Sequence, residues 1–124
     1  MKKYIGTKEV QAEPMNELTA VELGYARANE DNHEWRNGFH ILYPDNYNSW
    51  SPANVFNSAY KCADSFIDRM HIELEELQKR IKKIERSEQS ENRDVLLDIQ
   101  YNIMKSYEYI LMLRISSLTD LLQG

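Results

Sequence analysis

The sequence predicts an α+β protein in which a small N-terminal antiparallel sheet with a short helix packs on a long hairpin of two antiparallel helices. Three observations support this fold class. From Phe56 to Ile84 an apolar residue recurs every three or four positions, which is the spacing of one helix face. A second ladder of this kind runs from Leu96 to Leu118. The residues before both ladders form short β-prone runs separated by turn residues.

The bulk properties limit the classes of protein that the chain can belong to. Its 124 residues suit a single compact domain, with the sheet lobe at residues 1–50 and the hairpin at residues 51–124. A formal charge of -5 disfavours binding to long nucleic acid, whose phosphates attract basic surfaces. No apolar run approaches the roughly 20 residues that span a bilayer, and no signal-peptide run follows Met1. We therefore expect a cytoplasmic protein without a membrane partner.

The first fifty residues predict about three strands and one short helix. Residues 3–12 carry β-forming side chains at both ends, and we expect the strand to stop before Pro14, which cannot donate to a ladder. Asn16 is expected to cap a short helix. Residues 38–43 form the clearest strand, and Asp45-Asn46 predicts a hairpin turn into a third strand.

The remaining residues predict two long helices. We expect Ser51 to cap the first helix, because Pro52 suits the first helical position, and the helix to run to about Arg86. Ser90 is the expected cap of the second helix.

Each long helix carries more apolar surface than a hairpin can bury. The second stripe of the first helix consists of Val55, Ala59, Cys62 and Phe66. The second helix carries two apolar stripes. The first consists of Leu96, Ile99, Ile103, Ile110 and Leu113, and the small Ser106 occupies the position of this stripe between Ile103 and Ile110. The second consists of Leu97, Met104, Tyr107, Leu111 and Leu118. We expect one spare face to receive the sheet and another to meet a second subunit.

The sequence offers little that would support catalysis. His33, His40 and His71 have no metal-ligand spacing, and no histidine forms a recognisable pair with a serine or cysteine nucleophile. Cys62 alone can form neither an intrachain disulfide nor a zinc cluster. The four glycines are scattered, so they form no phosphate-binding loop. We therefore expect a protein that is not an enzyme and that has no catalytic residues, metal or cofactor.

Two basic regions are candidates for binding an anion. Arg114 lies between Leu113 and Ile115, where it either reaches solvent or presents its planar fork of donors to a phosphate. The basic run at residues 79–86 is either a solvated helix end or a rim beside Asn92 and Arg93 at the start of the next helix.

Aromatic side chains supplement these cations. Tyr107 on the second helix and Tyr25 near Arg27 are able to stack a nucleobase if they line a pocket with arginines that hold phosphates. The candidate ligand-binding residues are Arg27, Asn92, Arg93, Tyr107 and Arg114.

Nearly the whole chain resembles a family of small phage proteins. The similarity is carried by residues 1–15 (MKKYIGTKEVQAEPM), residues 43–60 (YPDNYNSWSPANVFNSAY), the charged helix from Phe66, and residues 107–114 (YEYILMLR). The N-terminal motif also occurs in phage proteins with other C-terminal regions, so the assignment rests on the combination. In this combination the chain resembles the phage anti-Thoeris sponges, the first type of Thoeris anti-defence protein.

This resemblance implies a binding protein. Family members bind cyclic ADP-ribose-type immune signals, notably glycocyclic ADP-ribose, and sequester them without cleavage, which inhibits Thoeris immunity in the host bacterium. They assemble as dimers and higher oligomers, up to a hexamer, with pockets at subunit interfaces, and some bind cyclic oligonucleotides at separate sites.

Two other functions remain open from the sequence. In the first, the spare face of the hairpin docks a host or phage protein. Such a module would capture one specific protein in a pull-down, and its thermal stability would not change when nucleotides are added. In the second, the protein hydrolyses the same signal, and only degraded nucleotide would be recovered from it.

Overall fold

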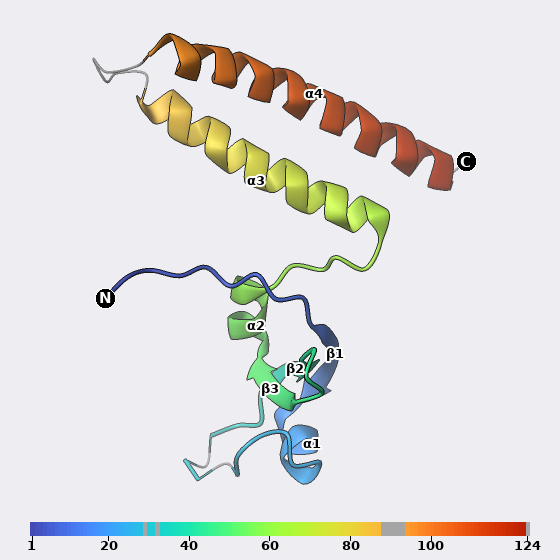
Figure 1. The fold of residues 1–124 in the computed structure, drawn as a ribbon. Helices are drawn as coiled ribbons and strands as arrows, with labels where there is room; N and C mark the ends of the chain where they lie inside the picture. Colours follow the sequence, from blue (N-terminus) through green and yellow to red (C-terminus); the bar gives the residue numbers. More distant parts are fainter. Residues whose placement is uncertain (29, 32, 88–93, 124) are drawn as a thin grey trace. The chain divides into compact units, whose positions relative to one another are not determined.

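In a computed structural model the chain divides into two compact units, Met1–Lys61 and Cys62–Gly124. The structure describes residues 1–28, 30–31, 33–87 and 94–123. The first unit contains β1 (Gln11–Asn16), α1 (Glu17–Glu22), β2 (Asn37–Leu42), β3 (Asn48–Pro52) and α2 (Ala53–Ala59), and the second contains α3 (Phe66–Arg86) and α4 (Val95–Gln123) (Figure 1). A three-stranded antiparallel sheet, short helices and a packed pair of long helices confirm the α+β class.

The sheet has the order β1-β2-β3, with both neighbouring pairs antiparallel. The predicted strand at residues 38–43 corresponds to β2, which is the central strand. The predicted hairpin turn is also confirmed. Asn46 adopts a φ of 70°, and its amide donates a 2.9 Å hydrogen bond to the carbonyl of Tyr43. Asparagine tolerates this left-handed conformation better than most residues.

The prediction for the first strand was wrong in its position. The strand is Gln11–Asn16, so it begins near the predicted end and contains Pro14. The six residues of β2 pair with these six, and residues 3–10 have no partner strand. Pro14 is tolerated because β1 lies at the edge of the sheet, where an outward amide needs no partner. The predicted cap is confirmed, since the Asn16 side chain accepts a 2.9 Å hydrogen bond from the Leu18 amide.

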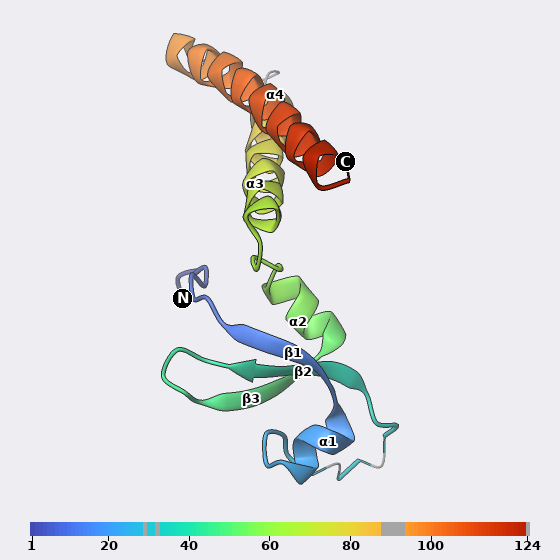
Figure 2. The ribbon, with the colours of Figure 1, turned by 90° about the vertical axis from the view of Figure 1, so that its right-hand side faces the viewer.

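Helix α2 covers one face of the sheet within the first unit (Figure 2). The ring of Phe56 stacks on that of Phe39 in β2 at 4.2 Å between centroids, and Tyr60 stacks on Phe56 at 5.0 Å. Ile41 lies two residues after Phe39, on the same side of the strand, and is buried. Phe56 and Tyr60, both partly buried, therefore pack on the sheet unit, although their spacing continues the pattern of the later helix.

The prediction of one helix from residue 51 to residue 86 was therefore wrong. Ser51 lies in β3, and no side chain caps α2, which ends at Ala59. A new helix begins at Phe66, because Ser65 and Asp68 form a capping box. The Ser65 hydroxyl accepts from the Asp68 amide at 3.0 Å, and the Asp68 carboxylate accepts from the Ser65 amide at 3.2 Å. This reciprocal pair satisfies two amides that otherwise lack helical partners.

Helices α3 and α4 form the predicted hairpin (Figure 1). Buried residues from both helices form its core, flanked by partly buried side chains. They are Met70, Leu77, Ile81, Leu111 and Ile115, with Leu74, Tyr101, Met104 and Leu118 around them. At the start of α4 the Asp94 carboxylate accepts a 2.6 Å hydrogen bond from the Leu97 amide. The predicted cap, Ser90, lies outside the described residues.

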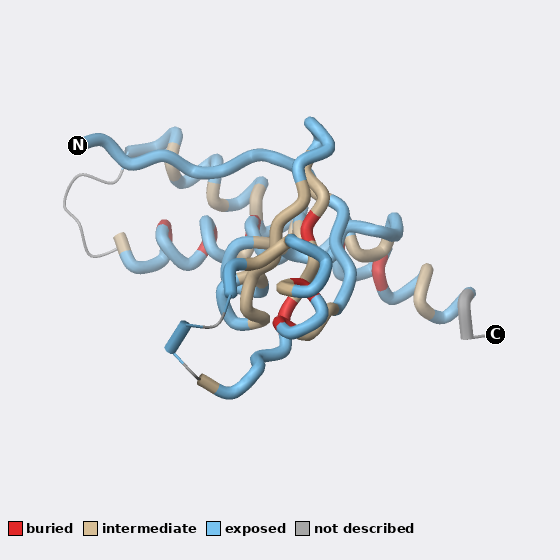
Figure 3. The backbone as a smooth tube through the Cα atoms, turned by 90° about the horizontal axis from the view of Figure 1, so that it is seen from below, coloured by how far each residue is buried: buried red, intermediate tan, exposed pale blue. Residues whose placement is uncertain are grey.

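The first predicted stripe of α4 is exposed in the second unit. In Figure 3, where the backbone is coloured by burial, most of the helix that leads to the C-terminus is coloured as exposed. Its five large side chains have exposed fractions from 49% to 76%: Leu96, Ile99, Ile103, Ile110 and Leu113. The other predicted stripe supplies Met104, Leu111 and Leu118 to the hairpin core. Across the described ranges, no helix combines the length and the apolar character needed to cross a membrane.

Candidate functional site

Two of the predicted ligand residues, Tyr107 and Arg114, lie on the same side of α4, two helical turns apart. Each contacts a side chain of α3. The guanidinium carbon of Arg114 lies 6.0 Å from the ring centroid of Phe66, and the Tyr107 hydroxyl donates a hydrogen bond to Glu73. Phe66 and Glu73 are also two turns apart, so two pairs of residues face each other across the hairpin. We call Phe66, Glu73, Tyr107 and Arg114 the hairpin cluster.

The electrostatics of the hairpin cluster follow from these contacts. The hydrogen bond to the Glu73 carboxylate raises the pKa of the Tyr107 phenol, and the positive charge of Arg114 opposes this shift only in part. Tyr107 therefore remains a neutral phenol near pH 7. Phe66 and Tyr107 are 53% and 39% exposed, so parts of both rings are accessible to a ligand. The cluster thus offers one cation, two aromatic surfaces and one carboxylate to solvent.

The other predicted ligand residues are not brought to this cluster. Arg27 is an exposed residue of the first unit, two positions after Tyr25. Asn92 and Arg93 lie outside the described residues. The participation of Arg27, Asn92 and Arg93 in a binding site stays a prediction. Among the predicted ligand residues, the structure brings only Tyr107 and Arg114 into one cluster.

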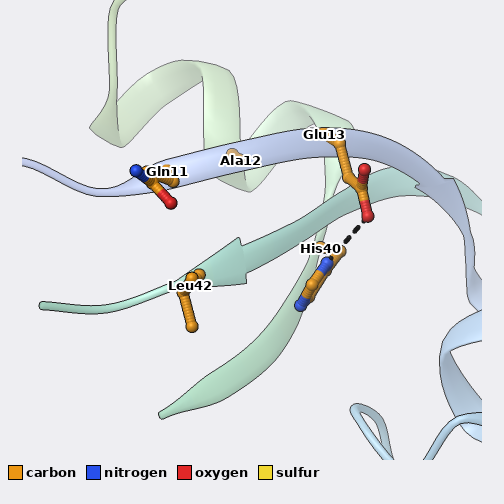
Figure 4. A pocket seen from close by; sticks show the side chains of 5 residues that line it. All are labelled: Gln11, Ala12, Glu13, His40 and Leu42. Carbon is orange, nitrogen blue, oxygen red and sulfur yellow. Dashed lines mark hydrogen bonds and ion pairs between the residues drawn. The ribbon is translucent and has the colours of Figure 1, made fainter. Parts of the chain in front are cut away.

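A shallow depression on the sheet was not anticipated from the sequence. It has a volume of about 210 Å³ and is lined by Gln11, Ala12, Glu13, His40 and Leu42 (Figure 4). In the close-up, Glu13 of β1 reaches across to His40 of β2, and their side chains form an ion pair at 3.0 Å. Glu13 and His40 are direct cross-strand neighbours, which follows only once the register of the sheet is known.

His40 is held on three sides. Its Nδ1 faces the Glu13 carboxylate at 3.0 Å, its Nε2 faces the Asn48 side-chain oxygen at 2.7 Å, and the Tyr25 ring stacks on it at 4.3 Å. Both ring nitrogens face acceptors, which favours the doubly protonated imidazolium. The hydrogen bond to Glu13, followed by the one to Asn48, raises the pKa of His40. With both nitrogens engaged, His40 offers neither a base nor a metal ligand to the depression.

A second unexpected group surrounds Glu17 in the first turn of α1. This carboxylate is 4% exposed and accepts hydrogen bonds from the backbone and the guanidinium of Arg36 and from His33. The Arg36 side chain is the largest cause that lowers the pKa of Glu17, to about 2. The hydrogen bonds from Arg36 and His33 to Glu17 anchor the polar loop to α1. The sequence identified that loop but gave no indication of its buried partner.

Metal chemistry finds no support in the described ranges, where no three histidine, cysteine or acidic side chains converge. The thiol of Cys62 is exposed and lies 3.4 Å from the Asp68 carboxylate, which already takes part in the capping box. The hairpin cluster is therefore the candidate site with the most suitable chemistry for an organic anion.

Comparisons of the chain with protein-family models, curated proteins and solved structures found no match.

Proposed function

We propose that this is a phage anti-defence protein that binds and sequesters a cyclic ADP-ribose-type immune signal, glycocyclic ADP-ribose. It acts in the cytoplasm of the host bacterium, as a homo-oligomer, and inhibits Thoeris immunity without cleaving the signal. The structural observation that supports the proposal is the hairpin cluster, in which Arg114 lies beside the exposed ring of Phe66 and near Tyr107. The resemblance to the anti-Thoeris sponges supplies the identity of the signal.

The chemistry of the cluster matches the parts of this ligand. A pyrophosphate is bound well by a guanidinium, which can donate two parallel charge-assisted hydrogen bonds. An adenine stacks on an aromatic ring, and the exposed parts of Phe66 and Tyr107 provide such surfaces. The Glu73 carboxylate accepts from Tyr107 and retains acceptor capacity for a ribose hydroxyl.

Isothermal titration of the purified protein with glycocyclic ADP-ribose tests the role of Arg114. We expect Arg114→Ala to weaken binding by roughly 10- to 100-fold, because a charge-assisted hydrogen bond contributes about 1.5–3 kcal/mol. Arg114→Lys should restore only part of the affinity, since an ammonium cannot donate in parallel. Lys105→Ala is the matched control, because it removes an exposed cation from another side of α4, where Lys105 pairs with Glu108 and not with the cluster.

The result that would reject this site is an affinity of Arg114→Ala equal to that of the unmodified protein. Far-UV circular dichroism of each variant establishes that the helices remain folded, so that a loss of binding is not a loss of structure.

A second candidate function is an interaction module for a host or phage protein. The exposed apolar stripe of α4 favours it, because contiguous apolar surface of this kind marks protein interfaces. This function predicts one specific partner in affinity purification, its loss on Ile103→Glu, and no calorimetric response to any cyclic nucleotide.

A further inference from the structure

We infer that Glu73 is a specificity-determining residue of the hairpin cluster. Its carboxylate restricts the site to organic anions whose negative charge lies at one end, beside Arg114, and excludes ligands that are negatively charged along their whole length. The inference rests on the proposed function, because it concerns the same site, and it adds the class of anion that the site rejects. Glu73 thereby selects among the anions that Arg114 attracts.

The first argument is the separation of the two charges of the cluster. Arg114 lies beside Phe66, and Glu73 accepts the hydrogen bond of the Tyr107 hydroxyl. Phe66 and Glu73 are two turns apart on α3, which places them about 10 Å apart along the helix axis. The site therefore has a cationic end and an anionic end, at a separation comparable to the length of a nucleotide.

The cationic end has a second arginine. Arg69 follows Phe66 by one turn of α3, and its guanidinium donates hydrogen bonds to the carbonyls of Ala63 and Asp64 at 3.1 and 3.4 Å. These contacts hold the charge of Arg69 near the start of α3, the end of the helix at which Arg114 lies beside Phe66. A phosphate group at this end is therefore attracted by two guanidinium groups.

The charge of Glu73 dominates the other end. Glu76 follows Glu73 by one turn and forms an ion pair with Lys79 at 3.4 Å, so these two charges largely cancel. Arg80 lies on the same side of α3 as Glu73, but two turns and about 10 Å farther along the axis. Because the energy between charges falls with distance, a group beside Tyr107 interacts most strongly with the Glu73 carboxylate.

The hydrogen bond from Tyr107 fixes the position of this carboxylate. Glu73 is exposed on α3, and the bond to the phenol of α4 holds its side chain toward the second helix. The same bond raises the pKa of the Tyr107 phenol, so the phenol keeps its proton and remains a donor at neutral pH. A carboxylate has about four acceptor positions, and Tyr107 occupies one of them. The others accept from hydroxyl or amino groups and repel phosphate oxygens.

These charges distinguish two classes of anion. In a ligand of the cyclic ADP-ribose type the pyrophosphate carries the negative charge, whereas the ribose hydroxyls and the adenine are neutral. Such a ligand can place its pyrophosphate beside Arg114 and a hydroxyl at Glu73. An inorganic polyphosphate is charged on every unit, so one of its phosphates must approach the carboxylate. At low salt this repulsion lowers the affinity by roughly tenfold or more.

Calorimetric titration of the full chain at low salt, with sodium tripolyphosphate and separately with glycocyclic ADP-ribose, tests the inference. We expect Glu73→Gln to bind tripolyphosphate roughly tenfold more tightly than the unmodified protein does, because the amide removes the charge and can still accept from Tyr107. Glu75→Gln is the matched control, since it removes the same charge from another side of α3 and should leave tripolyphosphate binding unchanged. Far-UV circular dichroism establishes that each variant is folded.

The outcomes separate this inference from the proposed function. Equal tripolyphosphate binding by the unmodified protein and Glu73→Gln, including no binding by either, overturns the inference. An equal gain in Glu75→Gln also overturns it, because the effect would then come from net charge alone. A protein that binds glycocyclic ADP-ribose without the gain in Glu73→Gln retains the proposed function and rejects the role of Glu73. The gain in a protein that binds no glycocyclic ADP-ribose supports the role of Glu73 in excluding polyphosphates and rejects the proposed function.

Discussion

At the scale of single residues, the charged groups of the sheet unit are organised by internal contacts. Glu17 is buried by the loop that supplies Arg36 and His33, and His40 is enclosed by Glu13, Asn48 and Tyr25. Both groups make stability depend on pH, in opposite directions. The two tryptophans of the chain, Trp35 and Trp50, lie in this unit, so tryptophan fluorescence reports on its folding.

The Glu17 carboxylate is expected to stabilise the sheet unit at neutral pH. Its pKa is lowered from 4.5 to about 2 in the folded protein, chiefly by the Arg36 side chain. Because folding lowers the pKa of Glu17, the contribution of this carboxylate to the free energy of unfolding is complete above pH 4.5 and is lost as the pH falls toward 2. We expect Glu17→Gln to reduce the free energy of unfolding by about 2 kcal/mol at neutral pH and to weaken this acid dependence. Urea titrations followed by tryptophan fluorescence measure both effects, and Glu22→Gln on the same helix should change neither.

The His40 imidazolium is expected to stabilise the sheet unit at low pH and to lose this effect as the pH rises. Its pKa lies above 6.5 in the folded protein, with Glu13 as the largest cause. A raised pKa gives stability that is fully present below pH 6.5 and is lost as the pH rises through the folded value. His40→Gln should flatten this decline, whereas His71→Gln on α3 should leave it in place. A sheet unit equally stable on both sides of the His40 titration would refute the role of this ion pair.

At the scale of elements, Gly38 determines how β3 fits against β2 and β1. The Trp50 indole nitrogen donates a 2.8 Å hydrogen bond to the carbonyl of Met15, so its ring reaches from the third strand to the first. Gly38, which pairs with Met15, leaves room for that ring. A Cβ atom at this position would clash with the Ser51 carbonyl oxygen and lie 2.5 Å from the Trp50 ring.

Gly38→Ala is therefore expected to destabilise the sheet unit by about 2 kcal/mol, because the clash is with backbone and with a ring fixed by a hydrogen bond. The change should lower the urea midpoint in tryptophan fluorescence and shift the emission of Trp50. Gly6→Ala is the matched control, since a Cβ atom there meets nothing within 4 Å. Equal midpoints for the two variants would contradict the packing of Trp50 over Gly38.

The elements also show what the sequence could and could not predict. The central strand, the hairpin turn at Asn46, the cap at Asn16 and the paired long helices follow from local signals. The break between α2 and α3 does not follow from the apolar spacing, since Phe56 continues the pattern of the hairpin but packs on the sheet. The capping box at Ser65 was the available signal for that break. The start of β1 could not be predicted from its own residues, because it depends on the length of β2, the partner strand much later in the sequence.

At the scale of the whole molecule, the described structure consists of one unit built on a sheet and one built on a helical hairpin. The hairpin core centres on Leu111, which is fully buried against α3. Of the predicted site, spacing along α4 sufficed to place Tyr107 and Arg114 on one side of the helix. Their partners Phe66 and Glu73 depend on how two distant helices align, which no local pattern specifies.

Leu111→Ala is expected to lower the stability of the hairpin by about 3 kcal/mol, since it removes buried methyl groups and leaves a cavity. Thermal and urea unfolding followed by far-UV circular dichroism measure the change. Met112→Ala, the neighbouring position with half of its side chain exposed, should cost less than about 1 kcal/mol. A similar loss in both variants would show that the hairpin is not packed around Leu111.

Recovery of the ligand tests the central claim most directly. The protein is incubated with glycocyclic ADP-ribose, examined by native mass spectrometry beside a panel of other cyclic nucleotides, then denatured, and the released nucleotide is weighed. The proposed function predicts a complex of defined stoichiometry and release of the nucleotide at its original mass, with the complex much reduced in Arg114→Ala. The absence of any complex, or the release of only degraded nucleotide, would contradict it.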